Sequence, residues 1–350
     1  MKYRYMGNTG LLVSRVCLGT MTFGNKEWGC DKKTSIDQTN RFLEAGGNFI
    51  DTADMYSQGE SESILGEALK GKKRDDLVIA TKCFFRMNNS PNAKGLSRKH
   101  IMEACEASMR RLQTDFIDLY QIHGPDPHTP FEETMRALDD LVRQGKVRYV
   151  GCSNLHAWHI LKANGISRLM NLEPLVCGQY QYNLIVRHVE REILPACEDQ
   201  GMGFICWSPL AAGMLTGKYK HTDRPEEGTR IAITAEFTLS RYWHDRGFAI
   251  IDAVKKAAEE AGKTPAQIAL SWLLHDRRVT SVIIGSRKPN QLADNLHIGD
   301  WDMPDELWSR LEETAAFDHG YPRSWMDSVY PRTFGEEEFY REIMHCLRES

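Results

Sequence analysis

The sequence lacks several features that would settle its class at once. No apolar run approaches the roughly 20 residues that span a bilayer, and the charged start Met1–Tyr5 is not followed by the apolar core of a signal peptide. Lys and Arg number 44 against 48 Asp and Glu, so the formal net charge is −4 and the basic excess of a nucleic-acid-binding protein is missing. We therefore expect a cytoplasmic protein with no membrane insertion and no nucleic-acid partner.

The nine cysteines form no recognisable framework either. Their number is odd and no two of them are spaced as C-x-x-C, which makes a disulfide scaffold or a zinc site a poor explanation. We predict reduced, mostly buried thiols and no metal site. A Pro/Ser-rich linker and long runs of like charge are also missing, so we expect residues 1–350 to form one domain.

What the chain does contain is a regular alternation of short apolar runs and helical patterns from about residue 16 to 300. Segments 97–113 and 131–144, for example, place apolar residues at i, i+3 and i+4. Eight strand-then-helix units of about 35 residues each match a (β/α)8 TIM barrel, an α/β fold. The expected strands are Val16–Thr20, Asn48–Ala53, Leu77–Cys83, Ile117–His123, Val147–Asn154, Leu175–Tyr182, Gly203–Leu210 and Val279–Ser286.

Three additions to the barrel are expected. Residues 3–14 are predicted to form an N-terminal β-hairpin around Gly7–Gly10. Residues 211–240 indicate a long, irregular polar loop after the seventh strand. Residues 301–350 follow the core (about 16–300) as a C-terminal helical extension, and its aromatic residues are Phe317, Tyr321, Trp325, Tyr330, Phe334, Phe339 and Tyr340.

Charged residues stand at the ends of three neighbouring strands. Asp51, Lys82 and His123 would meet at the carboxyl end of the barrel, where the active sites of such barrels lie. A plain ion pair at the barrel rim is the structural alternative for Asp51 and Lys82. Because burying an unpaired charge costs several kcal/mol, we favour a catalytic role for this group.

Tyr56, five residues after Asp51, completes a plausible catalytic set. A phenol has a pKa near 10, and a lysine ammonium held in place by a carboxylate would stabilise its anion. Such a tyrosine could protonate a developing alkoxide while His123 positions the carbonyl oxygen. No Ser or Cys stands beside a base in a recognisable motif, so we expect a hydride from a cofactor to be the nucleophile.

These residues carry a resemblance to a known family. Residues 46–56, Gly-Gly-Asn-Phe-Ile-Asp-Thr-Ala-Asp-Met-Tyr, resemble the aldo-keto reductase signature G-x-N-x-x-D-T-A-x-x-Y, and the segments ending in Lys82 and His123 resemble the strands that bear the family's lysine and histidine. The similarity runs from Arg4 to about Asn295, and the chain resembles the bacterial and potassium-channel β-subunit-like branch of the family. It implies an NADPH-dependent carbonyl reductase that works without a metal, with Asp51, Tyr56, Lys82 and His123 as its catalytic tetrad.

Nucleotide motifs of other folds are missing. There is no G-x-G-x-x-G fingerprint, and residues 213–218 fall one residue short of a P-loop. Barrels of this type bind phosphate through the loops after strands seven and eight. A glycine-bearing loop with Lys218 suits a pyrophosphate, and Ser286 with Arg287 suits a 2′-phosphate, which favours NADPH without excluding NADH.

The resemblance assigns further cofactor contacts. Asn154 and Gln179 are similar to the pair that binds the nicotinamide carboxamide, Arg230 is similar to a loop arginine that reaches the cofactor, and Tyr180 or Trp207 is expected to supply an aromatic face. The expected cofactor-binding residues are Gly19, Thr20, Met21, Asp51, Ser153, Asn154, Gln179, Trp207, Ser208, Pro209, Leu210, Gly213, Leu215, Lys218, Arg230, Gly285, Ser286, Arg287, Gln291 and Asn295.

Three functions remain in competition at this point. The first is reduction of a small aldehyde or ketone to an alcohol, or the reverse reaction. The second is a cofactor-sensing interaction subunit of the same family with slow turnover. The third, an aldolase-type barrel with Lys82 as a Schiff-base amine, fits poorly with Tyr56 five residues after Asp51. Phe23, Trp28, Phe84 and Phe85 are candidate pocket walls, while the substrate and any homo-oligomer stay open.

Overall fold

Eight parallel strands close into a barrel in the computed structural model, which describes residues 1–222 and 224–334. The strands follow one another around the barrel in chain order, and β10 closes it between β9 and β3. They are β3 (Val16–Gly19), β4 (Phe49–Asp51), β5 (Val78–Cys83), β6 (Ile117–Ile122), β7 (Val147–Ser153), β8 (Leu175–Gln181), β9 (Gly203–Trp207) and β10 (Val279–Ile284). The predicted (β/α)8 barrel is confirmed.

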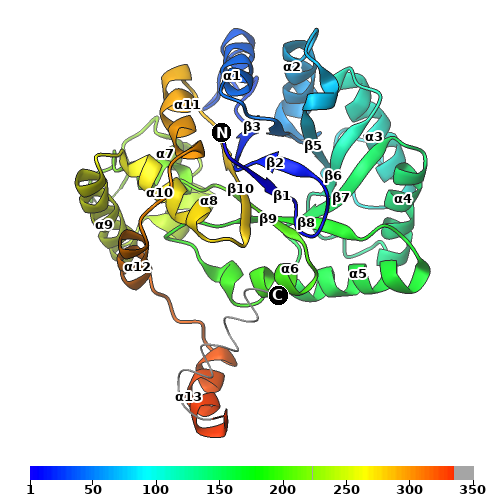
Figure 1. Ribbon diagram of the computed structural model, residues 1–350. Helices are drawn as coiled ribbons and strands as arrows, with labels where there is room; N and C mark the ends of the chain where they lie inside the picture. The colour runs from blue at the N-terminus through cyan, green and yellow to red at the C-terminus, as the bar shows by residue number, and fades with distance from the viewer. Residues whose placement is uncertain (223, 335–350) are drawn as a thin grey trace.

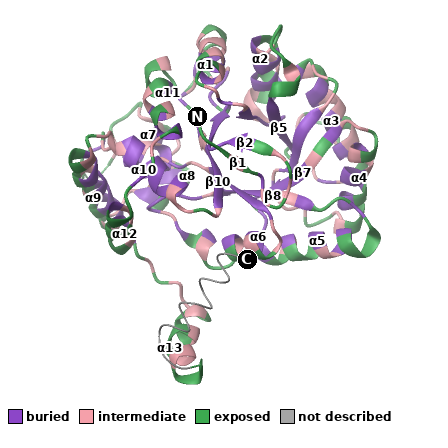
Figure 2. Cartoon of the chain, viewed as in Figure 1, coloured by how far each residue is buried: buried purple, intermediate pink, exposed green. Residues whose placement is uncertain are grey.

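Helices surround this sheet and bury one face against it (Figures 1 and 2). The principal ones are α1 (Lys32–Glu44), α2 (Glu60–Ala68), α3 (Arg98–Leu112), α4 (Phe131–Arg143), α5 (Ala157–Met170), α6 (Ile193–Asp199), α9 (Asp245–Ala261), α10 (Pro265–His275) and α11 (Pro289–Leu296). Short 3-10 helices are also present, among them η1 (Tyr56–Gly59), η2 (Arg74–Asp76), η3 (His188–Glu190) and η5 (His297–Gly299).

Local sequence signals fix where two of these helices begin. The Ser97 side chain accepts a hydrogen bond from the backbone N–H of His100 and starts α3. Thr264 and Gln267 form a reciprocal capping box at the start of α10, with Pro265 as its first residue. Each cap satisfies backbone N–H groups that have no partner inside the helix, and the start of α3 agrees with the helix predicted over residues 97–113.

Seven of the eight strands end one to three residues earlier than the sequence pattern suggested, and β5 ends at Cys83 as predicted. Asn154 has φ 59° directly after β7, and Ser208 has φ 52° directly after β9. An extended ladder cannot continue through a left-handed residue. The apolar runs thus extend past the hydrogen-bonded strands, and their polar last residues lie in the loops at the carboxyl end.

The N-terminal hairpin closes the opposite end of the barrel. Strands β1 (Tyr3–Tyr5) and β2 (Leu12–Ser14) pair antiparallel, as predicted. Met6 and Val13 are buried in the apolar cluster that fills the barrel interior. Gly7, with φ 53°, lies so close to β9 that a Cβ atom there would stand 2.3 Å from the carbonyl oxygen of Gly201. Among the described residues, the hairpin therefore covers the amino end of the barrel and leaves the carboxyl end open.

The insertion and the tail differ in part from expectation. Residues 211–240 are less irregular than predicted, because they contain η4 (Ala211–Thr216), α7 (Arg230–Ile233) and the start of α8 (Ala235–Tyr242). The apolar core also continues past the expected end at residue 300. Leu307 and Leu311 on α12 (Asp305–Thr314) are buried in it, as is Ala315.

Helix α13 (Arg323–Phe334) lies apart from the barrel (Figure 1). Tyr321, Trp325 and Phe334 are exposed there, while the predicted aromatic residues Phe339 and Tyr340 lie outside the described residues. The eight cysteines within residues 1–222 and 224–334 are free and buried. No helix in these two ranges is long and apolar enough to cross a membrane.

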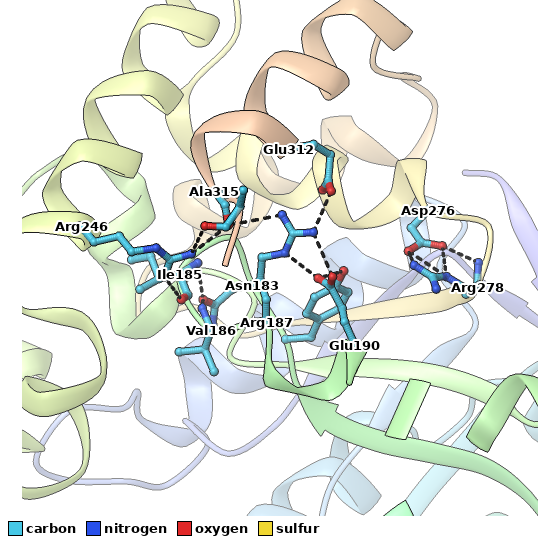
Figure 3. Close-up of polar contacts among 12 residues, drawn as sticks. Asn183, Ile185, Val186, Arg187, Glu190, Arg246, Asp276, Arg278, Glu312 and Ala315 are labelled. Atoms are coloured by element: carbon cyan, nitrogen blue, oxygen red, sulfur yellow. Dashed lines mark hydrogen bonds and ion pairs between the residues drawn. The ribbon is translucent and has the colours of Figure 1, made fainter. Parts of the chain in front are cut away.

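Arg187 and Arg246 dock the end of α12 onto the barrel (Figure 3), and Arg191 binds the segment that follows this helix. The buried Arg187 guanidinium bonds Glu190 through Nε and Nη2, at 2.6 and 2.9 Å, and also donates from Nη2 to Glu312 at 2.7 Å. Arg246 Nη2 donates to the carbonyl oxygen of Ala315 at 2.8 Å, and Arg191 bonds the carbonyl of Asp318 at 2.8 Å. The bond to Ala315 gives a partner to a carbonyl group that the end of α12 leaves without one.

We predict that Arg187→Met lowers the free energy of unfolding by about 3 kcal/mol or more, because Glu190 and Glu312 would be left as half-buried carboxylates without their cation. The measurement is urea unfolding at pH 7. Arg310→Met is the matched control, since Arg310 forms an exposed pair with Glu260 and its loss should cost at most about 1 kcal/mol. Equal losses in the two variants would contradict the prediction.

Candidate active site

The centre of the site is a lysine ammonium with no access to solvent. Lys82 Nζ on β5 donates to Asp51 Oδ1 at 2.5 Å, to the carbonyl oxygen of Thr52 at 2.8 Å and to the Tyr56 hydroxyl at 3.3 Å. All three N–H groups of the ammonium thus have an acceptor. Burial by itself would lower the pKa of Lys82, but Asp51 and Tyr56 outweigh it and raise that pKa. The amine stays charged, which disfavours a Schiff-base role.

The Asp51 carboxylate is held from both sides. Oδ1 faces Lys82, and Oδ2 accepts hydrogen bonds from Gln179 Nε2 at 2.8 Å and from Gln121 Nε2 at 3.1 Å. Gln121 is a residue that the sequence pattern did not single out. It lies beside Lys82 in the register of β5 and β6, so it reaches the same carboxylate from the next strand.

His123 follows β6 and stands beside the tyrosine. The rings of Tyr56 and His123 meet edge to face with their centroids 5.8 Å apart, and Phe85 packs on the other side of His123 at 4.9 Å. Burial, with Lys82 adding to it, lowers the pKa of His123 well below its usual range. The imidazole is therefore neutral at pH 7.

Burial and the lysine act on the tyrosine in opposite directions. Lys82 stabilises the Tyr56 anion, as expected. Burial raises the pKa of Tyr56 above its usual value, Lys82 opposes this effect, and Asp51 adds to it. The lysine acts in the predicted direction, but in the protein alone it does not outweigh burial.

A cavity of about 730 Å³ opens above these residues at the carboxyl end of the barrel. Tyr56 and His123 line it together with most of the predicted cofactor residues. Those lining it are Gly19, Met21, Asp51, Ser153, Asn154, Gln179, Trp207, Ser208, Pro209, Leu210, Gly213, Lys218, Arg230, Gly285, Ser286, Arg287, Gln291 and Asn295.

Three predicted contacts point elsewhere. Leu215 of η4 is fully buried in the apolar core. The Thr20 hydroxyl is buried and accepts a hydrogen bond from Ser61 at 2.8 Å. Tyr180 follows the inward-facing Gln179, so the alternation of the strand turns it to the outer core against Phe204, and Trp207 is the aromatic that lines the cavity.

Pocket-wall candidates divide in the same way. Trp28 and Phe85 line the cavity, whereas Phe23 is fully buried in the core. Met55, Tyr219 and Trp243 also line it and were not expected. Met55 adjoins Tyr56 in the signature, so it could have been found from the sequence; Trp243 follows the insertion, and nothing in its local pattern marks it.

The far end of the cavity gathers positive charge. Lys218, Arg230 and Arg287 all line it, and within residues 1–222 and 224–334 none of the three forms an ion pair. Burial, reinforced by Arg230 and Arg287, lowers the pKa of Lys218. The Arg230 guanidinium lies 4.8 Å above the ring of Trp28, so the insertion contacts the first loop across the cavity. Three cations without an ion pair can bind an anionic group.

The loop after β10 is held in place from two directions. Ser286 Oγ donates to Gln38 Oε1 on α1 at 2.9 Å, and Gln291 Oε1 accepts from the backbone N–H of Arg287 at 3.2 Å. These bonds fix the backbone that presents Arg287. In the described part of the chain, no three His, Cys, Asp or Glu side chains are arranged to hold a metal ion.

Comparison with known proteins agrees with this geometry. The sequence pattern of the Aldo/keto reductase family matches residues 15–316. The chain belongs to this family. An uncharacterised oxidoreductase of Bacillus subtilis is 38% identical over 323 residues, which cover 89% of this chain and 95% of that protein. Like that relative, the chain is an aldo/keto reductase-family oxidoreductase.

Two further relatives differ in what their names describe. Versiconal hemiacetal acetate reductase of Aspergillus parasiticus is 38% identical over 296 residues, covering 78% of this chain and 85% of that enzyme. A Schizosaccharomyces pombe protein named for a voltage-gated potassium channel subunit beta is 37% identical over 325 residues, covering 90% of this chain and 93% of that protein. Reductases and proteins with channel-subunit names are thus both similar in sequence to this chain.

A second acid lies behind the tetrad of this reductase-family site. Asp54 is buried, and neither of its carboxylate oxygens accepts a side-chain hydrogen bond from the described residues. Its acidic neighbour Glu62 already accepts from Thr81 at 2.5 Å and from Arg111 at 2.6 Å. Burial, reinforced by Glu62 and opposed by Arg111 and Lys82, raises the pKa of Asp54 to about 7.

We predict that Asp54→Asn becomes stabilised relative to the wild type as pH rises. An unfolded aspartate ionises near pH 4, whereas folded Asp54 holds its proton to about pH 7, so ionisation opposes folding progressively across this window. The amide in Asp54→Asn cannot ionise. Above pH 7 the free energy of unfolding of this variant should therefore gain at most roughly 4 kcal/mol relative to the wild type. Urea unfolding at pH 5 and pH 8 measures it. Asp76→Asn, at an exposed acid, should show no such change; a pH-independent offset in Asp54→Asn would refute the prediction.

Proposed function

We propose that the protein is an NADPH-dependent carbonyl reductase in which Tyr56 gives the proton to an aldehyde or ketone oxygen. The observation that carries this proposal is the hydrogen-bonded chain from Asp51 through Lys82 to Tyr56, which ends at a cavity shared with His123. The family to which the chain belongs and its relative named as a reductase support the same chemistry.

The cavity suits a phosphorylated dinucleotide. Its volume of about 730 Å³ lies in the range of ligand sites, and its cations are gathered at the end away from the tetrad. Lys218 and Arg230 would hold the phosphates, Arg287 the additional 2′-phosphate, and Asn154 with Gln179 the carboxamide. When bound there, NADPH supplies the hydride that reaches the carbonyl carbon.

The residues of the chain provide the rest of the reaction. His123 Nδ1 is buried with no hydrogen-bond partner in the described residues, which leaves Nε2 to face the cavity and to donate to the carbonyl oxygen. Tyr56 donates its proton as that oxygen gains negative charge. The Lys82 N–H stabilises the phenolate that remains, and Asp51 keeps the lysine charged and in place.

The names of some relatives favour a second candidate function. The Schizosaccharomyces pombe relative is named for a potassium channel subunit, so a cofactor-sensing interaction subunit with slow turnover would use the same cavity. The two functions differ in rate rather than in geometry. Rapid multiple turnover of a probe aldehyde by the wild-type protein supports the reductase, whereas tight NADPH retention with turnover slower than once per minute supports the sensor.

We predict that Tyr56→Phe lowers kcat for NADPH-dependent reduction of 4-nitrobenzaldehyde by about 100-fold or more, because general-acid catalysis contributes that much. The Kd for NADPH, measured by fluorescence titration, should change less than threefold. Tyr5→Phe is the matched control at an exposed hairpin residue and should leave both values unchanged. Near-normal turnover by Tyr56→Phe would refute the proposed role.

We also predict that Arg287→Ala weakens NADPH binding about tenfold or more and NADH binding much less. A hydrogen bond between a guanidinium and a phosphate contributes about 1.5–3 kcal/mol, and only NADPH carries the 2′-phosphate. Fluorescence titration with the two cofactors measures the difference. Arg277→Ala, at an exposed arginine away from the cavity, is the control. Equal losses of affinity for NADPH and NADH would contradict the prediction, because Arg287 would then bind a part of the cofactor that NADPH and NADH share.

A further inference from the structure

We propose that Gln121 is a positioning residue that links the catalytic aspartate to the amide of Gln179, so that one side chain sets both the tetrad and the nicotinamide end of the cofactor site. This inference rests on the proposed function. Gln121 itself does not line the cavity, and it would act through its two neighbours.

The position of Gln121 inside the barrel is closely defined. It is fully buried on β6, beside Lys82 of β5 on one side and Gly151 of β7 on the other. A Cβ atom on Gly151 would stand 3.4 Å from Gln121 Cγ and only 2.5 Å from Cys177 Sγ. The glycine therefore leaves the space in which the longer glutamine side chain crosses the barrel interior.

Hydrogen bonds fix both ends of the Gln121 amide. Its Nε2 donates to Asp51 Oδ2 at 3.1 Å, and its Oε1 accepts from Gln179 Nε2 at 3.2 Å. Cys177 Sγ lies 4.0 Å from the same Oε1. Rotating the amide by half a turn would point its N–H groups at a donor and its oxygen at a carboxylate, so a single orientation is favoured.

Gln121 in turn fixes the orientation of Gln179. Gln179 Nε2 lies between two acceptors, Asp51 Oδ2 at 2.8 Å and Gln121 Oε1 at 3.2 Å. Its N–H groups are therefore used inside the barrel, and its amide oxygen is left for the cavity that Gln179 lines. An oxygen there accepts from the NH2 group of a carboxamide, whereas the flipped amide would oppose donor to donor.

Loss of Gln121 would consequently act in two places. Asp51 Oδ2 would keep only the Gln179 donor, which loosens the carboxylate that holds Lys82 against Tyr56. Gln179 would lose one of the two acceptors that set its amide orientation, which weakens selection of the carboxamide. A residue that merely filled space would produce neither effect.

The test compares Gln121→Leu and Gln121→Glu with the wild type, and Gln144→Leu on the exposed end of α4 serves as the matched control. Each variant is first checked for wild-type circular dichroism and melting temperature. The Kd for NADPH is measured by fluorescence, and kcat for 4-nitrobenzaldehyde is measured between pH 5.5 and 9. The binding measurement needs no turnover.

For Gln121→Leu we expect kcat to fall about tenfold or more, as for loss of a hydrogen bond to a charged group, and the Kd for NADPH to rise severalfold. For Gln121→Glu we expect a new pH dependence. A protonated glutamic acid can donate to Asp51, but an ionised one repels it, so kcat should approach the wild-type value at low pH and fall as pH rises.

Wild-type values of kcat and Kd in Gln121→Leu, or a wild-type pH profile in Gln121→Glu, would overturn the inference. If Gln121→Leu fails to fold, the glutamate variant, which keeps the shape of the side chain, still decides the question through its pH profile and Kd. Failure of the proposed function would appear in the wild-type protein as absent carbonyl turnover. Failure of this inference would appear in a wild-type protein that turns over carbonyls normally, with Gln121 variants whose kcat, pH profile and Kd for NADPH equal those of the wild type.

Discussion

The buried Lys82 ammonium is the constraint on which the site depends. A charge inside a barrel is tolerated only when it is paired and every donor has an acceptor, and Lys82 meets this condition with a carboxylate, a backbone carbonyl and a phenol. Because these acceptors come from β4 and the loop that follows it, the lysine fixes how that loop leaves the barrel. The position of Tyr56 is thus a consequence of neutralising the lysine.

The same requirement extends through the barrel interior. Asp51 needs donors for its second oxygen, and Gln121 and Gln179 supply them from β6 and β8. The polar layer can exist only because the barrel is closed below it, where Met6 and Val13 of the hairpin join the apolar interior. The interior therefore changes from apolar at the amino end to polar at the carboxyl end, and this gradient determines which end opens into a cavity.

Sequence reasoning located most of this arrangement because strand ends and the spacing of the signature are local properties. The strand-end residues Asp51, Lys82 and His123 indicated the catalytic end before any contact was known. Gln121 escaped notice because a single glutamine within an apolar strand carries no local signal, and its importance depends on a carboxylate two strands away. Thr20 and Leu215 were predicted as cofactor contacts because their neighbours in the chain are such contacts. Their side chains point into the protein instead, since the direction of a side chain depends on packing. The effect of burial on the pKa of Tyr56 was missed for a related reason, since burial is a sum over the whole environment.

Electrostatics separates the two ends of the cavity. At the tetrad, one cation and one carboxylate face each other and His123 is neutral, so this end carries little net charge and suits an uncharged carbonyl group. At the other end, Lys218, Arg230 and Arg287 stand together with no carboxylate paired to them in the described residues, and burial, reinforced by the two arginines, lowers the pKa of Lys218. The whole-chain charge of −4 conceals this local excess, because a nucleotide site needs only a few cations gathered at one place.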